Sequence, residues 1–367
     1  MNLLKHSLKS QKKQLDFPLL ATVGILVIFG LMMVYDASVV QGLKDFNDSL
    51  YYIRQQLIWA AIGIVSLIFF AGFDYNRLKA FSAPLLFFSL ALLLAVFIPN
   101  LGVSGGGAHR WLKFGSITIQ PAEVIKLTGV IFLAALFEKK PKLVPFLLLV
   151  VGVTLVTAVL QKDLGSTVVF VATAISLYFA SGGSIWHFVA FAPFGILGLV
   201  LLIFTSGYRS KRVLAFLDPF SDIQGFTYHI SQVLIAFGSG GLLGLGLGQS
   251  RQKFEYIPQV STDSIFAIIG EELGFVGGSF VIILFAVVIL RGLKIAQNCH
   301  DNFGKILSIG LTSWLGIQVI INLSSMTALL PLTGVPLPFI SYGGSALVAN
   351  LTAIGILLNI SKQTVRT

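Results

Sequence analysis

Ten long apolar segments, separated by short polar connections, constrain this 367-residue chain more than any other feature of its sequence. Helical segments of about 20 apolar residues match the hydrocarbon core of a bilayer. Lipid offers the backbone no hydrogen bonds, so only helices and closed barrels cross it, and barrel strands would be short and alternating. The sequence therefore predicts an all-α polytopic membrane protein, with ten transmembrane helices in a single domain, 1–367. The segments are 17–35, 56–72, 80–98, 119–137, 143–160, 164–180, 185–205, 264–290, 303–329 and 340–360.

The composition excludes the soluble classes of protein. Hydrophobic residues make up 56% of the chain and charged residues 11%, where a soluble domain has about 25% charged residues. A water-soluble globule, a disordered chain and a coiled coil are all incompatible with these values. The single cysteine excludes an intramolecular disulfide, and the five histidines are scattered, so no metal site is predicted. No cofactor is indicated, and the sequence neither requires nor excludes a divalent cation.

The distribution of lysine and arginine predicts the orientation. Most of the 25 cationic residues fall on one side if both termini are cytoplasmic, as the positive-inside rule requires. Residues 1–16 are then a cytoplasmic tail, and 206–263 form a large extracytoplasmic loop between the seventh and eighth helices. Part of that loop, Ser231–Leu247, is too apolar for disorder and predicts a re-entrant or surface-lying segment.

The remaining cations favour an anionic substrate. They lie at the predicted extracytoplasmic ends of the spans, among glycines, prolines and aromatic residues, and include Arg54, Arg110 and Lys126. The net charge of +10 is therefore explained by the membrane rule together with a negatively charged ligand. Nucleic acid is not predicted as a partner.

Several charged residues at the ends of spans leave two interpretations open, because charge is expensive there. Glu123 and Lys126 share one helix face and form either a packing pair or the polar wall of a cavity. Asp163 either shapes a turn or contacts a substrate, and Arg54 either extends its charge to the interface or binds an anion. Asp263, at the start of the eighth span, is either a helix cap or a functional carboxylate.

A proline- and glycine-rich segment, Leu330–Ser345, precedes the last span. It contains three prolines before Ser341 and predicts a rigid, non-helical path. Irregular backbone at membrane depth is tolerated only inside protein or beside a cavity. This segment is therefore expected to be buried or to line a site.

Several motifs follow one another along nearly the whole chain. They are Arg54-Gln55, Arg110-Trp111, Gln120-Pro121-x-Glu123-x-x-Lys126, Asp163-Leu164-Gly165, Phe216-Leu217-Asp218-Pro219, Gly238-Ser239-Gly240-Gly241, Thr262-Asp263, Gly270-Glu271-Glu272-Leu273-Gly274 and Pro336–Ser345. Taken together, these motifs resemble the SEDS family (shape, elongation, division and sporulation), whose members polymerise peptidoglycan.

Within the family, the segments Gly246–Lys253 and Leu329–Gly334 are more similar to the division-type FtsW than to the elongation-type RodA. Five positions depart from the usual pattern: Ala122 replaces serine, His229 replaces glutamine, Gln259 replaces glutamate, Ser261 replaces histidine and Ser264 replaces phenylalanine.

The resemblance implies an inverting glycosyltransferase that joins lipid-linked disaccharide-peptides (lipid II) on the extracytoplasmic face, with polyprenyl pyrophosphate as the leaving group. A sugar hydroxyl is a poor nucleophile and needs a base, for which Asp263 is the candidate. Pyrophosphate needs charge neutralisation more than a proton donor. The candidate substrate-binding residues are Arg54, Arg110 and Lys126 for the pyrophosphate, Glu123 to hold Lys126, Asp163 to orient the sugar or a cation, and Thr262 and Ser341.

Two alternative functions stay open: a flippase of the lipid-linked precursor, and a non-catalytic scaffold of the division machinery. The resemblance implies a class B penicillin-binding protein, a transpeptidase, as partner, and single-span division regulators as further partners. It places the protein in the bacterial cytoplasmic membrane. The sequence does not decide between a role in division, elongation or sporulation.

Overall fold

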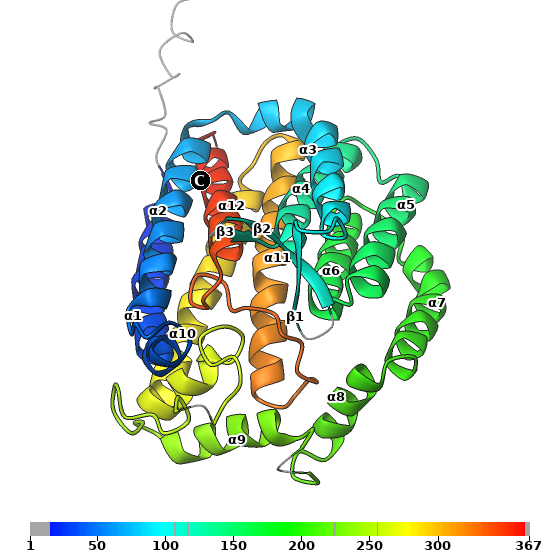
Figure 1. Cartoon of the computed structure of the whole chain (residues 1–367). Coiled ribbons are helices and arrows are strands. Elements are labelled where there is room, and N and C mark those ends of the chain that lie inside the picture. The colour runs from blue at the N-terminus through cyan, green and yellow to red at the C-terminus, as the bar shows by residue number, and fades with distance from the viewer. Residues whose placement is uncertain (1–14, 106–107, 116, 223–224, 255, 364–367) are drawn as a thin grey trace, which may run out of the picture.

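A helix lies on each of the ten predicted apolar segments (Figure 1). The computed structural model describes residues 15–105, 108–115, 117–222, 225–254 and 256–363. Within these ranges, eight helices are long and apolar enough to cross a membrane. The count of ten spans and their orientation therefore stay predictions. The helices on the segments are α1 (Phe17–Phe46), α2 (Tyr51–Gly72), α3 (Tyr75–Ala95), α4 (Pro121–Phe137), α5 (Leu143–Thr154) with its π-helical continuation η1 (Leu155–Leu160), α6 (Leu164–Ala180), α7 (Ile185–Phe204), α10 (Ile265–Gln297), α11 (Asn302–Met326) and α12 (Gly344–Gln363).

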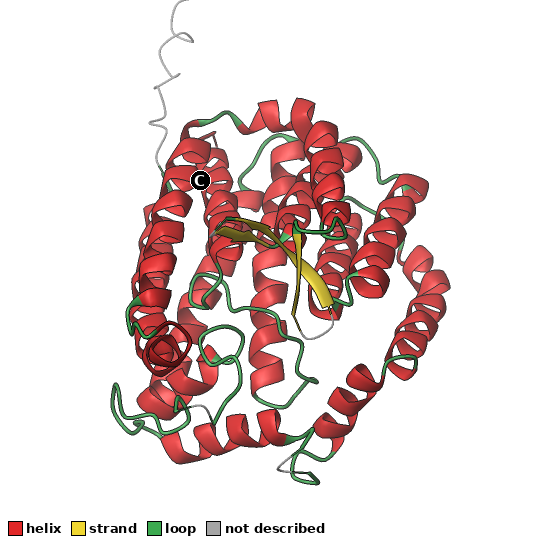
Figure 2. Ribbon diagram, in the orientation of Figure 1, coloured by secondary structure: helices red, strands yellow, loops and turns green. Residues whose placement is uncertain are grey.

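Two connections carry structure of their own. The predicted large loop contains α8 (Gly207–Leu217) and α9 (Tyr228–Gly240), which run along the lower edge of the bundle in Figure 1. Between α3 and α4 lies a small antiparallel sheet, β1 (Gly102–Gly105), β2 (Ala108–Phe114) and β3 (Ile117–Ile119), seen in yellow in Figure 2. This sheet was not predicted, because three short strands give a weak pattern beside the long apolar segments.

The two helices α11 and α12 form the centre of the bundle. The side chains of α12 are almost all buried, and it packs against α2, while α11 packs against α4, α6 and α10. At the other extreme, α7 has no buried residue and contacts chiefly α8. Figure 1 accordingly shows α7 at the margin of the molecule, joined to the rest through α8.

Aspartates supply several of the helix caps. Asp16 accepts a hydrogen bond from the N–H of Leu19 at 3.0 Å, and Asp301 accepts one from Gly304 at 2.7 Å. A side-chain acceptor at this position satisfies one of the free donors in the first helical turn. Part of the small set of charged residues is thereby used to begin helices.

The buried pair Glu271 and Glu272 fastens an irregular segment onto α10. Glu272 accepts hydrogen bonds from the N–H groups of Gly248 and Ser250, both at 3.0 Å. Glu271 accepts one from the N–H of Arg251 at 3.1 Å. Backbone amides thus satisfy two carboxylates that would otherwise be costly inside the bundle.

Glycines allow this close approach. α10 bends at Gly274, whose φ of 65° is a conformation that glycine adopts without steric cost. Gly244, with φ of 81°, lies so close to α10 that a Cβ would overlap the carbonyl group of Glu272. Gly244 and Gly274 therefore serve close packing of this segment against α10.

Lys253 joins this segment to α1, and its removal tests the arrangement. Its ammonium lies 2.8 Å from Asp36 and 3.2 Å from Glu272, with the lysine side chain 8% exposed. We expect Lys253→Met to reduce stability by about 3–5 kcal/mol, because it leaves the buried carboxylate of Glu272 and the half-buried one of Asp36 without their cation. Thermal unfolding of the purified protein measures this.

The matched control is Lys79→Met, which breaks an ion pair with Glu138 in which the lysine side chain is 48% exposed. Exposed pairs contribute about 0–1 kcal/mol, so this variant should melt close to the wild type. Equal losses in the two variants would contradict the packing role of Lys253.

Candidate functional site

Asp263 lies two residues before α10, next to the N-cap Ser264, and is 4% exposed. Thr262 donates a hydrogen bond from Oγ1 to Asp263 Oδ1 at 3.2 Å. Asn322, on α11, donates from Nδ2 to the backbone carbonyl of Asp263 at 2.9 Å and to that of Val335 at 2.8 Å. One amide on a central helix therefore positions the aspartate relative to residues 327–343, the non-helical connection between α11 and α12, which we call the 327–343 loop.

The guanidinium of Arg212 approaches the same point as the Asp263 carboxylate. A Cβ on Gly334 would lie 3.7 Å from Asp263 Oδ2 and 4.0 Å from Arg212 Nη1. Gly334 has φ of 71°, a backbone conformation that glycine adopts without steric cost. Arg212, on α8, donates from Nη1 to the carbonyl of Leu332 at 2.9 Å. The loop thus brings a carboxylate and a guanidinium together around one glycine.

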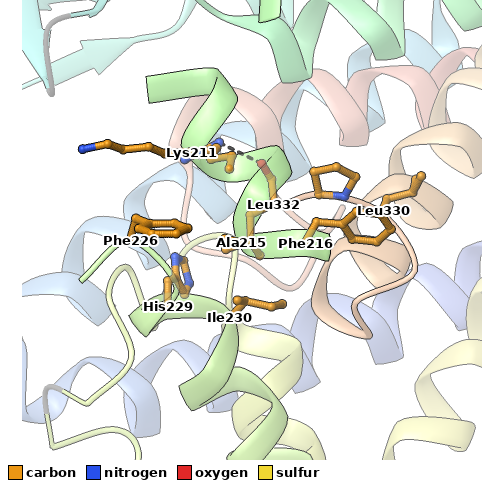
Figure 3. A pocket seen from close by; sticks show the side chains of 10 residues that line it. Lys211, Ala215, Phe216, Phe226, His229, Ile230, Leu330 and Leu332 are labelled. Carbon is orange, nitrogen blue, oxygen red and sulfur yellow. Dashed lines mark hydrogen bonds between the residues drawn. The ribbon is translucent and has the colours of Figure 1, made fainter. Parts of the chain in front are cut away.

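A cavity of about 260 Å³ opens between α8, α9 and the 327–343 loop (Figure 3). In Figure 3, His229 lies at one side of it, with Phe216 and Leu330 toward the other. Its volume is slightly below the roughly 300–1,000 Å³ of typical ligand pockets, so it suits part of a larger substrate. The lining residues are Lys211, Arg212, Ala215, Phe216, Phe226, His229, Ile230, Leu330, Pro331 and Leu332.

His229 connects this cavity to the aspartate. Its Nε2 lies 2.7 Å from the hydroxyl of Ser264, the residue after Asp263. Burial lowers the pKa of His229, Asp263 raises it, and Arg212 lowers it further, with a net lowering. The imidazole is therefore neutral near pH 7, and its contact with Ser264 is a hydrogen bond between uncharged groups.

Glu123 and Lys126 lie inside the bundle, 0% and 2% exposed. Lys126 Nζ donates to Glu123 Oε1 and to Gln318 Oε1, both at 2.7 Å. Gln318 in turn donates from Nε2 to the carbonyl of Pro336 at 3.1 Å. Glu123 and Lys126 thus form the packing pair, one of the two predicted alternatives. Through Gln318 this pair supports the 327–343 loop. Contact between Lys126 and a pyrophosphate, as predicted, requires a conformation in which this pair opens.

Asp163 and Ser341 also make internal contacts. Asp163 caps α6 through the N–H of Ser166 at 3.2 Å and accepts a hydrogen bond from Gln120 Nε2 at 3.2 Å. The hydroxyl of Ser341 accepts one from the N–H of Leu337 at 2.8 Å. Both residues hold backbone segments that border the site.

The contacts of Arg54 and Arg110 are with residues other than Asp263. Arg54, at the start of α2, forms an ion pair with Asp48 and is 62% exposed. Arg110, on β2, donates from Nη2 to the carbonyl of Lys162 at 2.6 Å. The structure therefore brings Thr262 and Asp263 together with the 327–343 loop, while the predicted cations are spread over several elements.

Sequence reasoning missed two residues that shape the site, Gln318 and Asn322. They are four residues apart and therefore share one face of α11. That spacing was a usable signal, because buried amides in a membrane helix need partners. Arg212 was one of the cations predicted at the extracytoplasmic side, but its position beside Asp263 could not be predicted, since its carbonyl partner lies 120 residues away in sequence.

Metal ligands are not grouped in the described part of the chain. Within residues 15–363, apart from the gaps given above, no three His, Cys, Asp or Glu side chains come together in a way that could hold an ion.

Comparison with known proteins places this arrangement in a family. The family model described as cell cycle protein, which covers FtsW, RodA and SpoVE, matches residues 17–366. The chain is 40% identical to stage V sporulation protein E of Bacillus subtilis over 363 residues, covering 97% of this chain and 99% of that protein. The chain belongs to the FtsW/RodA/SpoVE family.

Other members of the FtsW/RodA/SpoVE family agree in sequence and in structure. A probable peptidoglycan glycosyltransferase FtsW of Geobacter metallireducens is 37% identical over 371 residues, covering 99% of both chains. The crystal structure of the rod shape determining protein RodA of Thermus thermophilus has a TM-score of 0.69 at 25% identity, covering 96% of this chain and 98% of that one. A chain from a peptidoglycan synthase complex that coordinates polymerization and crosslinking has a TM-score of 0.74 at 26% identity, covering 95% and 98%.

The family and the apolar helices identify a multi-pass protein of the bacterial inner membrane.

The buried pair Glu123–Lys126 gives a test that separates packing from substrate binding. We expect Lys126→Met to lower stability by about 3–5 kcal/mol, because Glu123 loses its cation inside the bundle. The double variant Glu123→Gln, Lys126→Met should recover most of this loss, as seen in thermal unfolding. If the double variant is stable yet inactive, Lys126 also acts on the substrate; no recovery would contradict the pairing.

His229 predicts a pH dependence of stability. The imidazole of His229 has a pKa of about 6.5 in the unfolded chain and a lower pKa in the folded protein, so between these values the unfolded chain binds more protons. Stability should therefore fall as the pH drops below about 6.5 and should be unaffected by His229 above about 7.5. His229→Gln should flatten this slope in melting curves recorded from pH 5 to 8, while identical slopes would contradict the assignment.

Proposed function

We propose that this protein is a peptidoglycan glycosyltransferase that polymerises lipid II into glycan strands at the outer face of the cytoplasmic membrane. The observation that carries the proposal is the buried carboxylate of Asp263, beside the guanidinium of Arg212 and next to a cavity. The names of the relatives support the same activity. In the proposed orientation, both termini are cytoplasmic, and α8, α9 and the 327–343 loop lie at the outer face of the membrane.

The residues suit a transfer with inversion. Asp263 removes the proton from the attacking sugar hydroxyl, as a carboxylate placed within hydrogen-bond reach can do. The oxygen forms a bond to the anomeric carbon while the bond to the polyprenyl pyrophosphate breaks, and cations such as Arg212 stabilise the charge that leaves. A glycosidase needs two opposed carboxyl groups. None of the ten described residues that line the cavity is acidic.

The partner is proposed to be a class B penicillin-binding protein, a transpeptidase that crosslinks the product. One structural relative comes from a complex that coordinates polymerization and crosslinking, which supports this partner. We propose cell division as the process, supported by several relatives named FtsW, although the sporulation protein of Bacillus subtilis is similarly related. Single-span division regulators are proposed as further partners.

Asp263→Asn tests the mechanism. The amide keeps the shape of the side chain but cannot accept the proton, so we expect a loss of polymerisation of on the order of 10²-fold or more. Purified protein, with and without its transpeptidase, is incubated with lipid II, and the glycan product is resolved by gel electrophoresis. Melting temperatures confirm that the variant is folded.

The matched control is Asp45→Asn. Asp45 is exposed at the end of α1, where it accepts a hydrogen bond from Tyr52 at 2.9 Å, which the amide oxygen preserves. Full activity is expected there. Full activity of Asp263→Asn would overturn the proposed mechanism, and lipid II flipping without polymer formation by the wild type would overturn the proposed function.

A further inference from the structure

Two arginines from distant parts of the chain meet at the end of η1. Arg110, on β2, donates from Nη2 to the carbonyl of Lys162 at 2.6 Å. Arg209, on α8, donates from Nη2 to the carbonyl of Ala158 at 2.5 Å and from Nη1 to that of Leu202 at 3.1 Å. The two carbonyls at the end of η1 are four residues apart, so both guanidinium groups are held at one turn.

The contacts of these arginines orient them without neutralising them. In the described part of the chain, each is bound through backbone carbonyls, and no carboxylate pairs with either. Burial, and then the charge of Arg110, lower the pKa of Arg209, which shows that the like charges act on one another. The Nε atom of Arg110 is buried and has no hydrogen-bond partner among the described residues.

The π-helical turn explains how neutral acceptors come to be available. At the end of η1 the amide of Gln161 bonds to the carbonyl of Val156, and the amide of Asp163 bonds to the carbonyl of Thr157. Neither amide uses the carbonyl of Ala158, which accepts from Arg209. π-Helical turns are rare in proteins, and those that occur often lie at functional sites. An acidic partner would have cancelled the positive charge, whereas a carbonyl preserves it for a ligand.

The helix α8 carries a second inward arginine, Arg212, three residues from Arg209. The two lie on one helix face, about 4.5 Å apart along its axis. Arg209 reaches η1, whereas Arg212 reaches Leu332 and the point near Asp263. A single rigid helix thus places one cation beside the proposed base and another at a separate group of contacts.

We propose that Arg110 and Arg209 form a second anion site, which binds the diphosphate of the lipid-linked acceptor. This inference rests on the proposed function. The transfer joins two lipid-linked sugars, each carrying a diphosphate. The donor's diphosphate leaves the reacting carbon, so it must lie near Asp263 and Arg212. The acceptor's diphosphate stays bonded to the far end of its disaccharide, away from the hydroxyl that Asp263 deprotonates.

The bond changes of the transfer agree with separate sites for the two diphosphates. The acceptor hydroxyl oxygen bonds to the donor's anomeric carbon, its proton passes to Asp263, and the bond from that carbon to the donor's diphosphate breaks with the electron pair on the leaving oxygen. The acceptor's diphosphate remains unchanged. The acceptor's diphosphate therefore needs a site that neutralises its charge and keeps it in place during the transfer. Planar guanidinium groups do this through paired hydrogen bonds.

Equilibrium binding of radiolabelled undecaprenyl diphosphate to the full chain in phosphatidylcholine nanodiscs tests the site. The wild type should bind two molecules per chain. Arg110→Gln and Arg209→Gln should each weaken one binding class by on the order of 10-fold or more, and Arg212→Gln should weaken the other class. Lys113→Gln, an exposed cation on the same strand as Arg110, is the matched control and should bind two molecules.

Arg110 and Arg209 lie on separate elements, and melting temperatures identify any variant that is unfolded. A single binding class in the wild type, unchanged binding in both variants, or equal displacement by phosphatidylglycerol would overturn the proposal. The same titration with the Asp263→Asn protein separates the two hypotheses. Two sites there, together with full polymerisation by that variant, would reject the proposed mechanism while keeping the anion site.

Discussion

The 327–343 loop imposes the constraint on which the rest of the site depends. It has no regular secondary structure, yet Val335, Leu337 and Ile340 are at most 2% exposed. Backbone groups placed so deeply must find partners inside the protein, because lipid supplies none. Gln318 and Asn322 on α11 donate to its carbonyls. The polar residues of the central helix are therefore explained by this loop, and Asp263 is positioned by the same amide.

The charges of the molecule fall into two groups according to their partners. Lys126 and Lys253 are paired with buried carboxylates, and these pairs fasten segments together. Arg110 and Arg209 are held by neutral carbonyls and retain their charge. Burial of an ion pair costs desolvation that its attraction barely repays, so the first group specifies structure. The second group keeps the electrostatic capacity that binding of a diphosphate requires.

Comparison of prediction and structure shows which inferences rest on local information. The helices and the buried course of the 327–343 loop follow from apolar length and from prolines and glycines, which are local properties. Asp263 was predicted as the base because its motif is contiguous. Lys126 was predicted at the substrate because its charge is visible in sequence, whereas its partner Gln318 lies 192 residues away. Arg212 was predicted only as one of several extracytoplasmic cations, because its partner Leu332 lies 120 residues away.

The sequence by itself determined the class of protein, its family and the position of each apolar helix, since hydrophobic length and contiguous motifs survive without knowledge of neighbours. Only the tertiary structure decided which charged residues are consumed by packing and which remain available to a ligand. The physical reason is that the effect of a charge depends on its partner and its burial. In this protein those partners come from helices and loops far apart in the chain, as Arg212 and Leu332 illustrate.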